Sequence, residues 1–150
     1  MTSISIAREI EVSSDVIWDE LRRIDRHVLW MSDARSITFT SDLREGVGTA
    51  FICRTQVGPF RTDDRMEITG WEEHRSIRVR HRGVFQGEGV IAIEQLGPSR
   101  TRLSWDEHLS FPPYLLGPLG AMVAAPILRM IWKRNLVNFE HIVRKEDYST

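Results

Sequence analysis

Hydrophobic and polar positions alternate along most of the chain up to Phe111, which is the period of half-buried β-strands. The pattern predicts a first strand over residues 4–12. It predicts further strands, separated by turns with glycine, proline or charged residues, over residues 36–40, 49–57, 60–72, 76–83, 90–96 and 100–111. In the segment 76–83, Ile77, Val79 and His81 alternate with arginines. This indicates an antiparallel sheet with one buried face and one face in water.

Helical spacing of apolar residues occurs in three places. It predicts a short amphipathic helix over residues 15–24 and a second helical turn over residues 25–31. After the prolines at positions 112 and 113, a long helix is predicted from near residue 117 to near residue 145. The inward stripe of this long helix is expected to follow Leu119, Val123, Ile127, Ile131 and then Phe139 or Ile142.

Length and composition fit one globular domain over residues 1–150, with a core that needs neither disulfide nor metal. Apolar residues make up 41% of the chain and charged residues 27%, so the chain is not of the disordered class. The formal net charge of -1 argues against a generic nucleic-acid surface, which needs a basic excess. No uninterrupted apolar stretch reaches the length of about 20 residues that a membrane span needs, so no integral membrane association is expected.

The only cysteine, Cys53, is expected to be a small buried residue rather than a nucleophile, because no base is paired with it in the sequence. A lone cysteine cannot form an intramolecular disulfide and suits a reducing compartment. The first ten residues lack the apolar core of a secretory signal. We therefore expect a cytoplasmic location.

Short local patterns are spread over nearly the whole chain. They lie at residues 16–18 (VIW), at Trp30, at 45–49 (EGVGT), at 68–72 (ITGWE) and at 101–105 (TRLSW). These patterns, and above all their order, resemble the SRPBCC superfamily of helix-grip proteins. That superfamily includes START lipid-transfer domains, the birch-pollen-allergen family and bacterial polyketide cyclases.

The resemblance implies an α+β helix-grip fold. A curved antiparallel sheet of about seven strands would wrap around the long C-terminal helix, with two short helices between strands 1 and 2. It also implies a single START-like, polyketide-cyclase-like domain with a ligand pocket between the sheet and that helix. Members of the superfamily bind lipids, sterols, polyketides or plant hormones, and some catalyse cyclisation or dehydration. They share no single catalytic motif, so no catalytic residue is transferred from them.

Strand parity selects the residues expected to line such a pocket, which are mainly apolar with a few polar groups. The predicted ligand-binding set is Met66, Ile68, Val79, His81, Ile91, Ile93, Leu103, Trp105 and Glu107 from the strands, with Val123 and Ile127 from the helix. Asp64 shares the parity of Met66. Ordinary core packing is the alternative for each of these residues.

His81 and Glu107 are the candidate polar and catalytic groups. An inward histidine can contact a ligand carbonyl or act as a general base. A buried carboxylate is costly unless it is paired, so Glu107 is expected to meet Arg54, His81 or Arg134, or to have a raised pKa. The structural alternative is a satisfied core histidine and an ion pair.

Neither a metal nor a cofactor is expected, because the five histidines show no HxxxH spacing and the G-x-G pairs precede no helix. The predicted function is binding or transport of a small hydrophobic ligand such as a lipid, a polyketide or an aromatic metabolite. The first alternative is a polyketide cyclase or dehydratase with acid–base residues in the cavity. The second is a dimeric interaction module without ligand, which would use residues 112–120 and the outer side of the terminal helix. Trp132 and Arg134 on that helix are typical interface residues. The expected partners are thus a small hydrophobic molecule or, in the dimer hypothesis, a second copy of the chain.

Overall fold

The computed structural model of the chain describes residues 2–149. Within them, one sheet contains seven antiparallel strands in the spatial order β1-β7-β6-β5-β4-β3-β2. Along the chain, the elements are β1 (Thr2–Ile10), α1 (Ser14–Leu21), η1 (Ile24–Leu29), β2 (Ala34–Phe39), β3 (Ala50–Val57), β4 (Phe60–Glu72), β5 (Ser76–Arg82), β6 (Gln86–Gly97), β7 (Arg100–Ser110), η2 (Pro113–Leu115) and α2 (Gly117–Ser149). The elements η1 and η2 are 3₁₀ helices.

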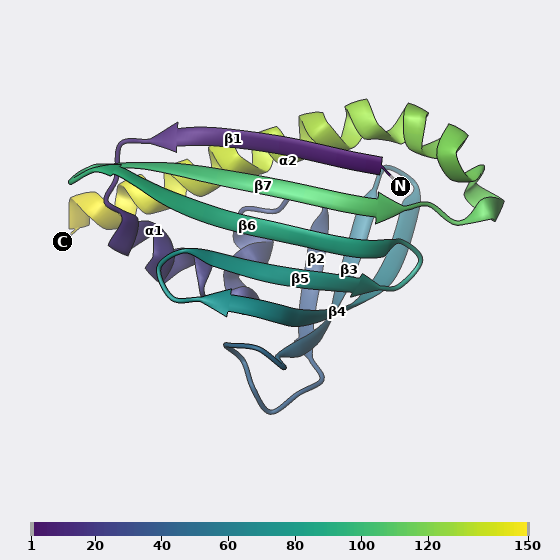
Figure 1. Cartoon of the computed structure of the whole chain (residues 1–150), viewed down its shortest axis with the longest axis horizontal. Helices are drawn as coiled ribbons and strands as arrows, with labels where there is room; N and C mark the ends of the chain where they lie inside the picture. The colour runs from purple at the N-terminus through teal and green to yellow at the C-terminus, as the bar shows by residue number, and fades with distance from the viewer. Residues whose placement is uncertain (1, 150) are drawn as a thin grey trace.

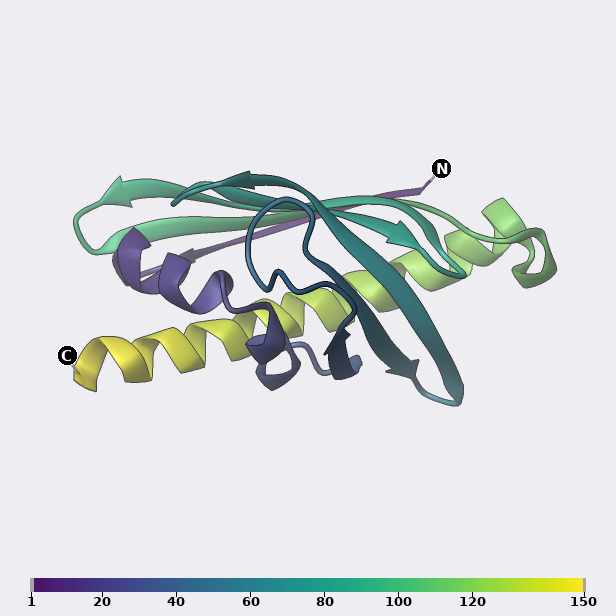
Figure 2. The same cartoon turned by 90° about the horizontal axis from the view of Figure 1, so that it is seen from below.

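The sheet is curved, and α2 lies along one of its faces (Figures 1 and 2). We call the face turned toward α2 the inner face and the opposite one the outer face. The two short helices α1 and η1 connect β1 to β2 and lie beside the second half of α2. The α+β class and the helix-grip arrangement are therefore confirmed. Among residues 2–149, no helix combines the length and the apolar composition needed to cross a bilayer.

Strand alternation sets the two faces as the sequence predicts. In β7, Leu103, Trp105 and Glu107 are buried, and the residues between them are more exposed. The sequence left the orientation of residues 49–57 ambiguous. In β3, Phe51 and Cys53 are buried, so this parity faces inward.

Strand β6 is longer than the predicted strand 90–96, because it begins at Gln86 and includes Gly87 and Gly89. The predicted strand 90–96 leaves both glycines outside it. In the structure they are paired with both neighbouring strands. Gly87 has a φ of 148°, and a Cβ added there would collide with the backbone carbonyl of His108, so a glycine is required at this position.

The centre of the core is aromatic. The Trp30 ring makes edge-on contacts with the rings of Trp105 (centroids 6.1 Å apart) and Phe139 (5.2 Å). Trp132 stacks on the Trp105 ring at 5.1 Å. Trp132 is buried, so the hypothesis that it anchors a partner interface is wrong, whereas Arg134 is exposed. This cluster joins β7, the residue after η1 and the middle and second half of α2.

The buried face of α2 differs from the predicted inward stripe. Leu119 is 65% exposed, Val123 is 72% exposed and Ile127 is 46% exposed, so their predicted inward orientation is wrong. The predicted residues were spaced by four, and such a row rotates about 40° around a helix of 3.6 residues per turn at each step. The observed buried face combines steps of three and four, and it comprises Ala121, Ala125, Leu128, Trp132, Leu136, Phe139 and Val143.

Candidate functional site

The inner face contains the strand residues that the sequence predicted for a ligand site. Ile68, Ile91, Ile93, Leu103, Trp105 and Glu107 are buried, and Met66, Val79 and His81 are half-buried. These nine residues extend over β4, β5, β6 and β7. Their position on the inner face agrees with the prediction, and a role of any of them in ligand binding stays a prediction.

His81 and Glu107 meet on this face, as one of the expected pairings requires. The His81 Nε2 and Glu107 Oε2 atoms are 3.1 Å apart. The indole N–H of Trp105 donates to the other carboxylate oxygen, Glu107 Oε1, at 2.9 Å. Both oxygens of the buried carboxylate are therefore satisfied. His81 is the more accessible member of the pair, because 14% of its side chain is exposed against 7% for Glu107.

The contact between His81 and Glu107 depends on glycine in the strand between them. His81 lies on β5 and Glu107 on β7, and these strands are separated by β6. Gly89 of β6 is the register partner of Glu107, and a Cβ added to Gly89 would lie at most 2.6 Å from both carboxylate oxygens. The carboxylate thus occupies the space that a side chain at position 89 would fill. An inward acidic residue opposite a glycine on the neighbouring strand is a pattern that can be found in a sequence once the strand register is known. Here it would have indicated the space that the Glu107 carboxylate occupies.

Asp64 on β4 is a second inward carboxylate, which the sequence analysis did not include in the site. It is 5% exposed, accepts a hydrogen bond from Thr62 at Oδ2 (3.0 Å), and has no partner for Oδ1 among the described residues. Its Oδ1 lies over another glycine, because a Cβ added to Gly83 would be 2.7 Å away. Burial raises the pKa of Asp64, and the Thr62 hydrogen bond, the charge of His81 and a smaller interaction with the Thr55 hydroxyl only partly oppose this rise.

Cys53 is the register partner of Asp64 on β3 and is buried, as predicted. Burial raises the pKa of the Cys53 thiol to about 11. The thiol is therefore protonated at neutral pH, and a nucleophilic role at that pH is disfavoured.

Opposing influences set the pKa of His81. Burial of the ring, the largest single influence, lowers the pKa, whereas the hydrogen bond and charge of Glu107 and the charge of Asp64 raise it. The net result is a pKa above the ordinary value of 6.5. His81 is thus suited to hold a proton near neutral pH, as a hydrogen-bond donor or a general acid.

We expect the stability of the protein to fall as the pH rises from 6.5 to 8.5. The folded protein holds the His81 proton more tightly than the unfolded chain does. This stabilisation is complete below the unfolded pKa and is lost as the pH rises through the folded pKa, with a slope of at most about 1.4 kcal/mol per pH unit. Urea unfolding measured across this range tests the slope, and NMR titration of the His81 ring tests its assignment.

Two other groups limit this pH window. Burial lowers the pKa of His27, so His27 affects stability as the pH falls below 6.5. Cys53 acts only above its ordinary pKa of 9.0. The control is Glu107→Gln, which removes the main influence that raises the pKa of His81, so the slope should become much smaller. An unchanged slope in this variant, or a His81 that titrates below 6.5 in the unmodified protein, would contradict the assignment.

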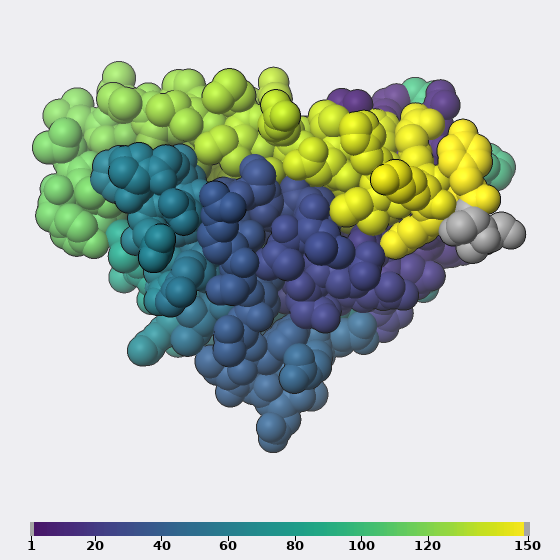
Figure 3. All heavy atoms as spheres, turned by 180° about the vertical axis from the view of Figure 1, so that it is seen from behind, coloured from purple at the N-terminus to yellow at the C-terminus, as the bar shows by residue number. Residues whose placement is uncertain are grey.

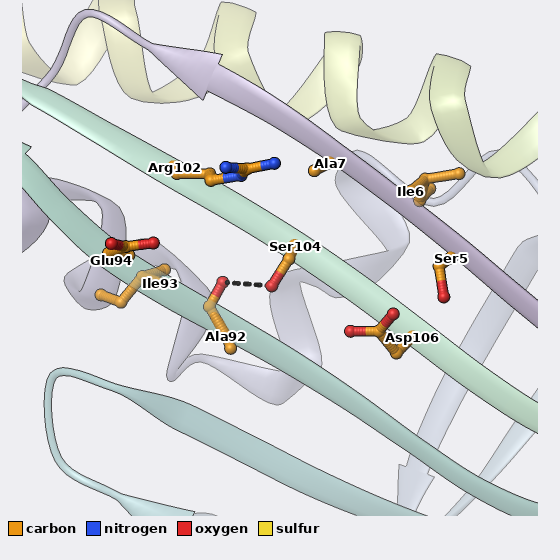
Figure 4. Close-up of a pocket in the computed structure, with 9 residues that line it drawn as sticks. All are labelled: Ser5, Ile6, Ala7, Ala92, Ile93, Glu94, Arg102, Ser104 and Asp106. Carbon is orange, nitrogen blue, oxygen red and sulfur yellow. Dashed lines mark hydrogen bonds between the residues drawn. The ribbon is translucent and has the colours of Figure 1, made fainter.

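A separate hollow of about 450 Å³ lies on the outer face, over β1, β7 and β6 (Figure 4). It is broad and open, and small side chains such as Ser5, Ala7, Ala92 and Ser104 form its floor. It contains none of the buried titratable groups described above. We therefore place the candidate site on the inner face, where buried polar groups lie among apolar residues. Across residues 2–149, no group of three or more His, Cys, Asp or Glu side chains is placed to hold a metal ion.

Comparisons with known proteins agree with this architecture. The sequence model of the family described as "Polyketide cyclase / dehydrase and lipid transport" matches residues 1–144. No curated protein matches the chain.

Solved structures with the same fold cover almost the entire chain. A protein from Thermus thermophilus is 15% identical, with a TM-score of 0.77 over 97% of this chain and 99% of that one. A truncated norcoclaurine synthase from Thalictrum flavum is 14% identical, with a TM-score of 0.71 over 95% and 92%. A START superfamily protein from Mycobacterium smegmatis is 14% identical, with a TM-score of 0.68 over 98% and 97%. At these identities the likeness concerns the fold alone.

Proposed function

The chain belongs to the polyketide cyclase/dehydrase and lipid transport family, and on that premise we propose that it binds a small hydrophobic molecule between the inner face of the sheet and α2. The observation that carries this proposal is the unpartnered Oδ1 atom of Asp64 on a mainly apolar face. Buried polar atoms are rarely left without a partner, and a ligand hydroxyl or N–H would supply one here. The ligand is thus an apolar molecule with at least one hydrogen-bond donor.

The course of α2 supports a site in this place. Over the described residues, the backbone of α2 comes close to β1 and β7 but to no other strand of the sheet. Near Ala121 and Ala125, the helix presents small side chains to the sheet. The inner face of β4 and β5, with Asp64 and His81, is therefore covered by side chains and not by the helix backbone.

Replacing Asp64 by asparagine should stabilise the protein at pH 7 and weaken ligand binding. The pKa of Asp64 is raised in the folded state, so the charged form costs stability above the ordinary value of 3.8, and the neutral amide removes this cost. We expect a gain of about 1 kcal/mol by urea unfolding. The affinity for 1-naphthol, an aromatic probe with one hydroxyl donor, should fall roughly 3- to 10-fold in calorimetric titration because the acceptor is weaker.

The matched control is Asp63→Asn on the same strand. The side chain of Asp63 faces outward and is exposed, and its hydrogen bond with Arg54 lowers its pKa. This control should leave naphthol binding unchanged and should not stabilise the protein. Equal binding by both variants, together with an empty protein in native mass spectrometry after gentle purification, would refute the proposed ligand site.

Catalysis by His81 is the second candidate function, and the raised pKa of His81 beside Glu107 favours it. The imidazolium would act as a general acid toward a bound ligand, and Glu107 would hold the ring in position. One protein of the same fold is a synthase, the norcoclaurine synthase of Thalictrum flavum. Turnover that follows the His81 titration and disappears in His81→Gln, with ligand affinity retained, would distinguish catalysis from transport.

A further inference from the structure

The first half of α2 and the turn before it expose an unusual number of large apolar side chains. Their exposed fractions lie between 46% and 74%. They are Tyr114, Leu116, Leu119, Met122, Val123, Ile127 and Met130. Figure 3 shows this part of the chain, in light green, at the outer border of the molecule. We call these seven residues the apolar ridge.

Helix geometry places the centre of the apolar ridge opposite the packed face of α2. Ala121 is buried and Leu128 is half-buried, and these two positions lie toward the sheet. At about 100° per residue, Val123 lies about 200° around the axis from Ala121. Leu119 and Met130 lie on the same outward side. A contiguous exposed apolar surface of this kind on a soluble domain marks an interaction site.

The formal charges of this part of the chain indicate which kind of partner the apolar ridge binds. From residue 108 to residue 139 the chain contains no aspartate or glutamate, but it contains Arg129, Lys133 and Arg134, all exposed. This segment has a formal charge of +3, although the whole chain has -1. Lys133 and Arg134 come one turn after Met130, so the outward side of α2 changes from apolar to basic along its axis. A bilayer with anionic headgroups is complementary to this order of apolar and basic side chains.

We propose that the apolar ridge docks on the surface of an anionic lipid bilayer. Its apolar side chains enter the boundary between headgroups and acyl chains, and Lys133 and Arg134 contact the headgroups. A second copy of the chain fits less well. In a two-fold contact of the ridge on itself, Lys133 and Arg134 of each copy would face the same segment of the other copy, which contains no acid to pair with them. The docking surface is separate from the proposed ligand site and does not depend on it.

Co-sedimentation with lipid vesicles tests the proposal on the full chain. We expect binding to vesicles of phosphatidylcholine with 30% phosphatidylglycerol, and at least tenfold weaker binding to pure phosphatidylcholine or in 0.5 M NaCl. The double variant Met122→Glu/Val123→Glu should reduce binding to anionic vesicles at least tenfold. Both side chains are exposed, so the fold should persist, which urea unfolding checks.

The matched control is Val47→Glu. Val47 is an exposed apolar residue in the loop before β3, away from the ridge. This variant adds a charge there and should bind anionic vesicles like the unmodified protein. Lys133→Glu/Arg134→Glu should lose the preference for anionic vesicles. Equal binding to neutral and anionic vesicles, or equal loss in the Val47 variant, would overturn the proposal. So would the absence of vesicle binding. If the protein does not bind vesicles but forms a dimer in sedimentation analysis, and the Met122→Glu/Val123→Glu variant disrupts that dimer, then the ridge is the interface between two copies of the chain.

Discussion

Replacing Phe139 by alanine should lower the free energy of unfolding by about 3–5 kcal/mol. Phe139 is fully buried in the second half of α2 and packs edge-on against Trp30, the centre of the aromatic core. The surrounding rings cannot close the space that the lost ring leaves, so the cost includes both the transfer of the ring and the cavity. This loss is a large part of the about 5–15 kcal/mol that keeps a typical domain folded. Urea unfolding followed by far-UV circular dichroism measures it.

The control for this variant is on the same helix. Met130→Ala removes a side chain that is 66% exposed, and it should change the stability by no more than about 0.5 kcal/mol. The contrast tests whether the packed side of α2, and not its outward side, contributes to the core. A loss of stability below about 1 kcal/mol in the Phe139 variant, or equal losses in the two variants, would contradict the assignment of Phe139 to the packed side of α2 and of Met130 to its outward side.

Replacing Gly89 by alanine should destabilise the protein by about 2–3 kcal/mol. A glycine-to-alanine change in a strand ordinarily stabilises by about 0.5–1 kcal/mol, so the expected sign is reversed. The new Cβ would occupy the place of the Glu107 carboxylate. That carboxylate would have to move away from Trp105 and His81, which now satisfy both of its oxygens. The pKa of His81 should fall, because Glu107 is the main group that raises it.

Two further variants separate this cause from a general effect of alanine. Gly97→Ala is on the same strand, and its Cβ would meet only the Cβ of Arg100, at 4.0 Å, so no loss is expected. The double variant Gly89→Ala/Glu107→Ala removes the collision and should be more stable than Gly89→Ala alone. If the double variant is less stable than that single variant, then the collision with Glu107 is not the cause.

The sequence was a good guide wherever the deciding interaction is local. Alternation in β5 and β7 placed Val79, His81, Leu103 and Glu107 on the inner face, because the orientation of a strand residue follows from its parity alone. In β6 this reasoning was incomplete, because Gly87 and Gly89 look like a turn until their partners on both sides are known. In α2 it failed for Val123, because an apolar residue can lie on either side of a helix that has two apolar faces.

The sequence by itself thus determined the order and approximate positions of the strands, the buried faces of the strands other than β3, the two short helices, the long terminal helix and the helix-grip class. It also supplied His81 and Glu107 as candidates. Only the tertiary structure decided that these two meet across Gly89, that Asp64 is left with an unpartnered oxygen, and which face of α2 is free. The reason is that periodicity acts over a few neighbouring residues. A contact between residues 81 and 107 depends instead on the register of three strands, and the free face of α2 depends on how the helix meets the sheet.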